Sequence, residues 1–473
     1  MIWTDWINKQ IQLIIERNPK GIIDIASGFG PSGKPHLGTL VEQLRVEQLI
    51  RKLRAERRIV RSRCFVDNMD GLRKIPPGFI IEDKFLNTPL CDIPYQNSNL
   101  AMINTADLKE QMNQWNITNE IVFASDFYQT SEFYKVAILI LHNYQKILDI
   151  ILPTLNSERK KFYSPFMPIC NISGKIMQDS VCEYGETYIK YINSKGEITK
   201  LDLRFDRYKL QWHVNFAARW IACNTDFEMY GKDLISSAEV ASQICKALNY
   251  NPPIQMMYEL FLNDEGAKMS KSSGNYQLTP ELWGKIAPLG SLEHFAFQNP
   301  QSAKKLTLKK IPDYVEEYLN KTDYYILHPL QTELSFRMLV HIARLVKFDI
   351  QVAQQYMQHY YKKNLTNAEL LLVKQACEYA KLTHNPQTIT IDQNLKDAII
   401  CLIQKIENIE NDPVKLQTLT YDIGKKYFGE KNLVQWFSNL YIILLENDTG
   451  PRIGSLFACI GIKKVIELLK AAI

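Results

Sequence analysis

The chain has 473 residues, of which 46% are hydrophobic and 23% charged, a composition typical of a globular protein with two to four domains. Its net charge of +5 permits nucleic-acid binding without requiring it, because a local patch matters more than the total. Nine cysteines without paired spacing argue against a disulfide scaffold, and no apolar run is long enough to span a bilayer. We therefore expect a cytoplasmic protein that does not bind a membrane.

The chain opens with a predicted amphipathic helix over residues 1–20. The apolar run 22–26 then predicts a buried strand, because its residues are mostly β-branched. Glycines and prolines end this run, and a helix is predicted over about residues 37–58. A strand, a glycine-rich turn and a helix N-terminus together form a common phosphate-binding arrangement. The turn residues expected to contact phosphate are Pro31, Ser32 and Gly33.

His36 and Gly38 lie at the start of this predicted helix. The spacing fits neither a P-loop nor a full Gly-x-Gly-x-x-Gly motif. A histidine in the first helical turn can donate a hydrogen bond to negative charge that develops on a phosphate. A glycine beside it leaves room for a flat base to stack on the backbone. On these residues alone, an ordinary strand-to-helix turn with a chance histidine remains an equal alternative.

The next segment is first basic and then acidic. Seven arginines and lysines between residues 51 and 63 suit either a solvated helix end or contact with an RNA backbone. A short strand at 64–66 then leads into Asp67 and Asp70. Ligands of open α/β sheets bind at the carboxyl ends of strands, so these acids are candidates to face a cationic substrate. Capping of the following turn explains them equally well.

Residues 77–205 are predicted to form an inserted module. Residues 77–165 have a mainly helical pattern, with a short strand at 121–123 and a long helix at 134–152. Residues 164–204 contain short β-like runs separated by glycine turns. Cys170 and Cys182 stand alone in this part, and two isolated cysteines do not make a tetrahedral zinc site.

A polar loop follows far downstream and carries two lysines and three serines, which are good phosphate-binding groups. Its composition by itself also suits an ordinary solvated loop. Beyond about residue 290 the pattern is helical, with clear apolar spacing over 336–348, 367–381, 395–409 and 433–446. We therefore predict an α/β domain over residues 1–290, with a parallel sheet and an inserted α+β module, followed by an all-α region over 291–473.

The helix start and the polar loop together resemble the paired signature motifs of class I aminoacyl-tRNA synthetases. The first motif reads His36-Leu-Gly-Thr39 and the second reads Lys268-Met-Ser-Lys-Ser272. Residues 26–33, 67–76, 210–220 and 227–233 narrow the resemblance to class I lysyl-tRNA synthetase, colinear over about residues 20–300. The resemblance implies a Rossmann-type catalytic domain and a helical anticodon-binding region. It also implies attachment of L-lysine to tRNA(Lys) through lysyl-adenylate, in which ATP accompanied by Mg²⁺ is the substrate and AMP and diphosphate are released.

The resemblance also assigns roles to matching residues. The catalytic residues it implies are His36, Lys268 and Lys271. ATP contacts are expected from Pro31, Ser32, Gly33, His36, Gly38, Lys268, Met269, Ser270, Lys271 and Ser272. Lysine contacts are expected from Gly28, Asp67, Asp70, Trp220 and Asp233, although a tryptophan in such a segment is more often part of the core.

The sequence also departs from the family pattern. Thr39 stands at the last position of the first motif, and Leu234 stands where many members have histidine. The paired cysteines that many members carry in the inserted module are missing apart from Cys170, so we expect no structural zinc. A glutamyl-type synthetase of the same fold and a non-catalytic tRNA-binding paralogue remain as alternatives. We expect a monomer.

Overall fold

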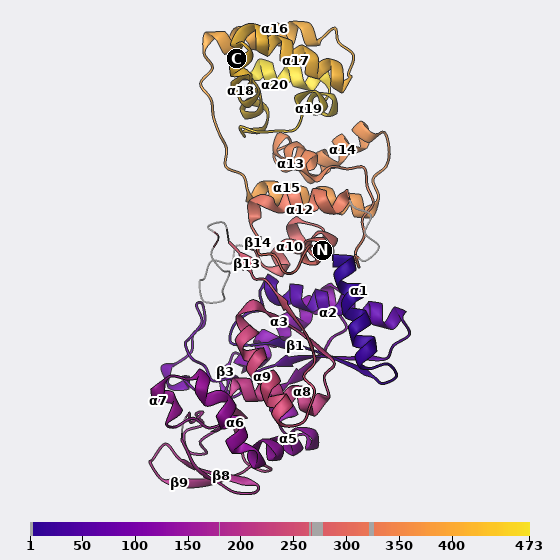
Figure 1. The fold of residues 1–473 in the computed structure, drawn as a ribbon. Coiled ribbons are helices and arrows are strands. Elements are labelled where there is room, and N and C mark those ends of the chain that lie inside the picture. The colour runs from indigo at the N-terminus through magenta and orange to yellow at the C-terminus, as the bar shows by residue number, and fades with distance from the viewer. Residues whose placement is uncertain (1–2, 179, 264–265, 267–277, 321–325) are drawn as a thin grey trace. The chain divides into compact units, whose positions relative to one another are not determined.

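In the computed structural model we describe all residues except 1–2, 179, 264–265, 267–277 and 321–325. The chain divides into two compact units, whose folds Figure 1 shows. The first unit contains residues 1–280 and 296–307, and the second contains residues 281–295 and 308–473. The chain thus passes between the units more than once, which a single boundary near residue 290 does not describe. The functional roles given above to 1–290 and 291–473 stay predictions.

A five-stranded parallel sheet forms the centre of the first unit. Its order is β12-β11-β1-β2-β5, so the strands that follow β1 in the chain are added first on one side of β1 and then on the other. This reversal next to β1 is the switch point at which doubly wound sheets bind ligands. The predicted α/β class is confirmed. The strands are β1 (Ile23–Phe29), β2 (Val60–Val66), β5 (Glu120–Phe123), β11 (Phe227–Gly231) and β12 (Ile254–Tyr258).

β1 is longer than the predicted strand, which was expected to end at Ala26. It pairs with β2 over seven residues, from Ile23–Val60 to Phe29–Val66. Gly28 therefore lies inside the strand and not in the turn, because the ladder to β2 continues to its end. The register of β1 with β11 covers Ile25–Phe227 and Ala26–Glu228.

Helices cover the two faces of this sheet. Ser27 of β1 donates a hydrogen bond to Gln43 of α2 at 3.2 Å, while Phe65 of β2 lies under Arg219 of α8. α2 is buried on more than one side, since its buried residues include Glu42, Gln43, Arg45 and Glu47. The helices around the sheet are α1 (Trp3–Arg17), α2 (Leu37–Ala55), α3 (Leu100–Gln114), α4 (Ala124–Phe127), α8 (Trp212–Cys223) and α9 (Ile235–Ala247).

The basic end of α2 is engaged in contacts within the protein. Arg51 pairs with Glu47 at 2.6 Å, and Arg63 pairs with Asp24. Arg58 donates to the backbone carbonyl oxygens of Asn18 and Pro19, both at 2.6 Å. These bonds fasten the α2–β2 connection to the end of α1, which favours a structural role over an RNA contact for these arginines.

The inserted module combines helices with small sheets (Figure 1). The helix predicted over 134–152 is two helices, because the chain leaves helical geometry at Asn143 (φ −108°, ψ 25°). The helical elements are α5 (Ser131–His142), α6 (Tyr144–Ile151) and α7 (Ser157–Lys160). The strands are β3 (Pro94–Tyr95), β4 (Ser98–Asn99), β6 (Phe166–Pro168), β7 (Val181–Tyr184), β8 (Tyr188–Ile192), β9 (Ile198–Asp202) and β10 (Tyr208–Leu210).

Among the described residues, no single helix is both long enough and apolar enough to cross a membrane. One bent pair, Ser131–His142 and Tyr144–Thr154, meets that criterion by length and composition when its two members are taken together, at an angle of 76°. Both members contribute to the core of this unit, where Phe133, Ile140 and Ile147 are fully buried.

The second unit consists of helices. Side-chain caps begin several of them, and Thr366 and Glu369 form a reciprocal capping box at α15. The helices are α10 (Pro280–Ile286), α11 (Leu289–Phe297), α12 (Ile311–Leu319), α13 (Phe336–Leu345), α14 (Ile350–Tyr361), α15 (Asn367–Leu382), α16 (Gln393–Ile406), α17 (Pro413–Phe428), α18 (Leu433–Leu445), α19 (Ile453–Ile460) and α20 (Ile462–Ala472). The short strands β13 (Phe261–Leu262) and β14 (Lys304–Lys305) pair within the first unit.

Candidate active site

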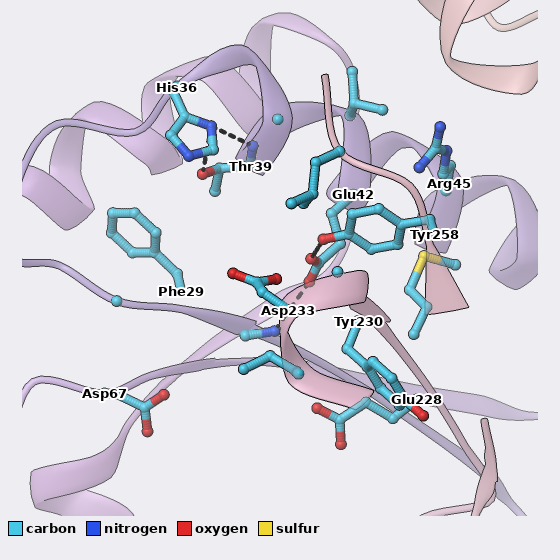
Figure 2. A pocket seen from close by; sticks show the side chains of 18 of the residues that line it. Phe29, His36, Thr39, Glu42, Arg45, Asp67, Glu228, Tyr230, Asp233 and Tyr258 are labelled. Atoms are coloured by element: carbon cyan, nitrogen blue, oxygen red, sulfur yellow. Dashed lines mark hydrogen bonds between the residues drawn. The ribbon is translucent and has the colours of Figure 1, made fainter. Parts of the chain in front are cut away.

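A cavity of about 580 Å³ opens at the carboxyl ends of the parallel strands. β1 contributes Gly28 and Phe29 to its wall, and β11 contributes Met229, Tyr230 and Gly231. The cavity therefore lies at the switch point beside β1, where a doubly wound sheet binds its ligand. Figure 2 shows side chains from the sheet and from the start of α2 around it.

His36 and Gly38 act together at the start of α2. The Nδ1 atom of His36 accepts the backbone N–H of Thr39 at 3.1 Å, so His36 is the N-cap of the helix (Figure 2). This bond fixes the tautomer and leaves Nε2 as the protonated nitrogen. A Cβ atom at position 38 would lie 2.8 Å from Cε1 of His36. Gly38 is therefore needed for the imidazole to fold over the first turn.

Glu42, which lies one turn further along α2, forms hydrogen bonds with residues of two strands, β1 and β12. Its carboxylate accepts the backbone N–H of Gly28 at 3.2 Å and the hydroxyl of Tyr258 (Figure 2). Burial raises the pKa of Glu42 to about 7, although both hydrogen bonds act in the opposite direction. Arg45 lies with its guanidinium carbon 5.1 Å from the centroid of the Tyr258 ring and donates to the carbonyl oxygen of Ala296 at 3.0 Å.

A buried ionic cluster lies on the α8 side. Nη1 of Arg219 lies 3.3 Å from Oδ1 of Asp67, and its Nη2 lies 3.7 Å from Oε1 of Glu228. Burial lowers the pKa of Arg219, but the charges of Asp67 and Glu228 outweigh this and raise it overall. Burial raises the pKa of Glu228 to about 7. The indole N–H of Trp220 donates to Glu228, which itself lines the cavity.

Asp70 and Asp233 complete the acidic wall. Asp70 forms an ion pair with Lys209 of β10, so the inserted module reaches the edge of the cavity. Burial lowers the pKa of Lys209 to about 8, while the charge of Asp67 raises it. Asp233 is exposed in the short turn after β11, and its Oδ1 lies 2.8 Å from the place of a Cβ atom at Gly231. The absence of a side chain at Gly231 therefore leaves room for this carboxylate.

The lining is richer in acids than in bases. The carboxylates that line it are Glu42, Asp67, Asp70, Glu228, Asp233 and Glu259, and the guanidinium groups are Arg45, Arg73 and Arg219. Such a wall suits a ligand with a positive side chain, while the α2 N-terminus and the His36 imidazole suit an anionic group at the other end.

The family model described as "tRNA synthetases class I (K)" matches residues 3–346 of this chain. The chain belongs to this family. The lysine–tRNA ligases of Rickettsia bellii (strain OSU 85-389) and Rickettsia conorii are each 30% identical to this synthetase, over 495 and 491 residues. In both cases the match covers 95% of this chain and 93% of the relative. The glutamate–tRNA synthetase of Elizabethkingia anophelis has a solved structure with a TM-score of 0.41 at 12% identity, covering 96% of this chain and 99% of that chain. That score is too low to add to the assignment.

The predicted site residues of the synthetase fall into four groups. Gly28, His36, Gly38, Asp67, Asp70 and Asp233 line the cavity. Ser32 and Gly33 line a second cavity beside it, and the carbonyl oxygen of Pro31 accepts a hydrogen bond from Asn104. Trp220 is 2% exposed and does not line the first cavity, but its indole N–H donates to Glu228, which does. Lys268, Met269, Ser270, Lys271 and Ser272 lie outside the described residues.

The sequence did not single out Glu42, Lys209, Arg219, Glu228 or Tyr258, all of which line this synthetase's cavity or pair with residues that do. A charged residue on an otherwise apolar helix face was an available signal for Glu42 and Arg45. No local signal links Arg219 to Asp67, because 152 residues separate them.

No cluster of three or more His, Cys, Asp or Glu side chains positioned to hold a metal is found among the described residues. Cys170 lies with its Sγ atom 3.4 Å from Oγ of Ser194. Burial raises the pKa of this thiol, but hydrogen bonds with Ser173 and Ser194 outweigh it and bring the pKa to about 6. The expectation of no structural zinc stays a prediction.

Proposed function

We propose that the cavity beside β1 activates L-lysine with ATP and that the same site transfers the lysyl group to tRNA(Lys). The family assignment supports the reaction. The location of the cavity at the switch point of the sheet supports this cavity as the catalytic site. The synthetase is a lysine–tRNA ligase of class I. The proposal also gives roles to individual residues.

Adenylate formation needs positioned donors more than a covalent nucleophile. The lysine carboxylate attacks the α-phosphorus of ATP, diphosphate leaves, and negative charge grows on the phosphate oxygens in between. Nε2 of His36 is the donor that we assign to this charge, because Nδ1 is occupied by the Thr39 N–H. The backbone N–H groups at the start of α2 add to it. Mg²⁺ enters with ATP as part of the substrate.

Lys268 and Lys271 are assigned the β- and γ-phosphates of ATP. This assignment rests on the second signature motif, which lies outside the described residues. Lys271→Ala is expected to reduce the rate of activation more than it weakens lysine binding. An unchanged rate would remove the assignment.

We assign selection of the amino acid substrate to the acidic side chains that line the cavity. Two of the three arginines that line the cavity are already engaged: Arg219 by Asp67 and Glu228, and Arg45 by the Tyr258 ring and a backbone carbonyl. The anionic side chain of a glutamyl-type substrate therefore finds little uncompensated positive charge. An incoming ammonium group instead favours the ionised form of Glu228, and the Asp233 carboxylate lines the same cavity. We assign the lysine side chain to this wall, with Gly28 at its backbone edge.

The test is the identity of the amino acid that the full-length protein attaches to total tRNA. Purified protein is incubated with MgATP, total tRNA and one radiolabelled amino acid at a time, including lysine, glutamate and arginine. We expect charging with lysine, loss of charging when EDTA removes Mg²⁺, and a large reduction in His36→Ala. Charging with glutamate in place of lysine would overturn the proposal, and binding of tRNA without any charging would favour a non-catalytic protein.

A further inference from the structure

Lys209 of β10 is a buried cation of the inserted module that pairs with an acid of the catalytic cavity. Its side chain is 11% exposed, and its ammonium group forms an ion pair with the carboxylate of Asp70. Asp70 lines the cavity beside β1, whereas Lys209 does not. Any effect of Lys209 on a ligand in this cavity therefore passes through Asp70.

The strand that carries Lys209 is fixed within the inserted module. β10 pairs with β6 in an antiparallel register that places Lys209 opposite Met167. Its neighbours Tyr208 and Leu210 are buried in the core of the module, and the backbone N–H of Leu210 donates to the hydroxyl of Tyr128 at 3.0 Å. Because successive side chains of a strand point to opposite faces, Lys209 is directed away from that core and towards the loop after β2.

Five ionisable side chains are grouped at this edge of the cavity: Asp67, Asp70, Lys209, Arg219 and Glu228. Arg219 pairs with Asp67 and Glu228, and Lys209 pairs with Asp70. When all five are ionised, three carboxylates face two cations, and one negative charge remains to attract the ammonium group of lysine. Without Lys209 the group would carry two uncompensated negative charges.

The charge of Asp70 matters because anionic phosphates must enter the same cavity. His36 and Arg73 line the cavity together with Asp70, and His36 is the donor assigned to the α-phosphate in the proposed function. A carboxylate without a cation beside it repels a triphosphate. The contact with Lys209 reduces this repulsion without placing another side chain in the cavity.

We propose that Lys209 is a positioning residue for ATP: it holds the Asp70 carboxylate and compensates its charge, so that the triphosphate can bind beside His36. The inference rests on the proposed function, because it requires ATP in the cavity beside β1. It also gives Asp70 a different role from the acids that select lysine. Asp70 is engaged by the inserted module, while Glu228 and Asp233 face the ammonium group of the substrate.

The affinity of full-length protein for MgATP, measured by equilibrium dialysis without tRNA or lysine, tests this role. We expect Lys209→Met to bind ATP about tenfold more weakly than the wild type, because methionine replaces the aliphatic chain but leaves Asp70 charged. Lys209→Arg keeps a cation and should bind ATP more tightly than Lys209→Met. ATP affinity of Lys209→Met equal to that of the wild type would overturn the inference.

The double variant Lys209→Met/Asp70→Asn decides between compensation and direct contact. It removes the ammonium group and the carboxylate together, so the affinity for ATP should return close to the wild-type value. If Lys209 instead bound a phosphate directly, the double variant would bind ATP as weakly as Lys209→Met. That result would also overturn the inference.

Two further measurements separate an electrostatic effect from damage to the fold. The affinity for lysine should not fall in Lys209→Met, because the cavity edge becomes more negative, and an equal loss for lysine and ATP would contradict the proposed role. Lys190→Met is the matched control, since Lys190 pairs with Glu183 at 2.8 Å in the same module and neither residue lines the cavity. It should leave the affinity for ATP unchanged.

Asp70→Asn alone keeps the inference falsifiable if Lys209→Met does not fold. This variant leaves the charge of Lys209 uncompensated and should strengthen ATP binding, so unchanged or weaker binding would overturn the inference. Charging of total tRNA with lysine by the wild type reports on the proposed function. If the wild type charges lysine and Lys209→Met keeps its affinity for ATP, the inference fails while the function stands.

Discussion

The Arg219 guanidinium lies 3.3 Å from Asp67 and 3.7 Å from Glu228, and this one buried cation of α8 therefore contacts both the residue that follows β2 and a residue of β11. Its side chain is 3% exposed, so the two carboxylates have little water to compensate them. Arg219→Met leaves both acids buried without their cation and should lower the free energy of unfolding by about 3–5 kcal/mol. Urea denaturation measures this loss.

The matched control for that prediction is Arg337→Met. Arg337 pairs with Asp313 at 2.6 Å, and the two side chains are 57% and 49% exposed. Solvent screens such a pair, so the expected loss is about 0–1 kcal/mol. The prediction fails if the two variants lose similar amounts of stability.

Glu42 predicts a pH dependence of stability. Burial raises its pKa from 4.5 to about 7 in the folded protein. Between these two values the folded protein holds a proton that the unfolded chain has released, so the free energy of unfolding falls as the pH rises from about 4.5 to 7. Glu42→Gln cannot titrate and should lack this component, which is worth about 3 kcal/mol. Denaturant unfolding of wild type and variant at pH 5 and pH 7.5 gives the comparison, and equal pH dependence in both proteins would contradict it.

His36 has two roles that substitution can separate. His36→Asn keeps a good N-cap for α2, whereas His36→Ala loses it and should be less stable than His36→Asn by about 1 kcal/mol. Both variants lose the Nε2 donor, which should cost about 2–4 kcal/mol in the transition state for activation. The measurements are urea unfolding and the single-turnover rate of adenylate formation. If His36→Asn forms the adenylate at the wild-type rate, His36 serves as a cap and not as a donor.

Zinc content is a fourth prediction. The inserted module keeps Cys170, whose thiol lies beside Ser194, and we expect it to fold without metal. Elemental analysis of the purified protein should find much less than one zinc per chain, and dialysis against a chelator should leave the urea midpoint unchanged. About one tightly bound zinc per chain would show that the prediction is wrong.

Anticodon reading is expected from the helical unit. Among the aromatic residues of this unit, Trp436 is fully buried and donates through its indole N–H to the carbonyl oxygen of Thr420 at 2.9 Å, so it belongs to the core. Tyr427 is half-buried, with Nζ of Lys426 4.9 Å from the ring centroid. Tyr427→Ala should reduce kcat/KM for a tRNA(Lys) transcript with the native anticodon more than for one with an altered anticodon.

Full-length protein is preferable to a truncation for this test. A chain ending near Lys310 would lose Tyr314, which packs against Trp283 and Phe295 of the retained α10 and α11. If wild-type protein charges the native and altered transcripts equally well, the helical unit does not read the anticodon.

The local part of this architecture was readable from the sequence. The apolar run before His36 and the glycine spacing predict β1, the turn and α2, because strand, turn and helix start are set by neighbouring residues. Long helices such as α15 were equally clear, since apolar periodicity and a capping box coincide there. The break at Asn143 was missed because the apolar spacing continues on both sides of it.

The interior of the site was less accessible to sequence reasoning. Asp67 and Asp70 were identified as cavity acids, but their pairing with Arg219 and Lys209 depends on contacts that only the folded chain creates. Trp220 was linked to lysine by resemblance, and in the structure it is buried with its indole N–H donating to Glu228 of the cavity wall. Pairings between distant segments depend on the order and register of strands, which local periodicity does not encode.

β1 pairs to different extents with its two neighbours in the central sheet. β1 is joined to β2 along seven residues, whereas its register with β11 covers two pairs, Ile25–Phe227 and Ala26–Glu228, in strands that are both fully described. On the carboxyl side of those pairs, Gly28 of β1 and Tyr230 of β11 line the cavity. An adenylate bound in this cavity, as proposed above, would contact both of these strands. We therefore expect bound adenylate to slow amide hydrogen exchange in β1 and β11 relative to the ligand-free protein.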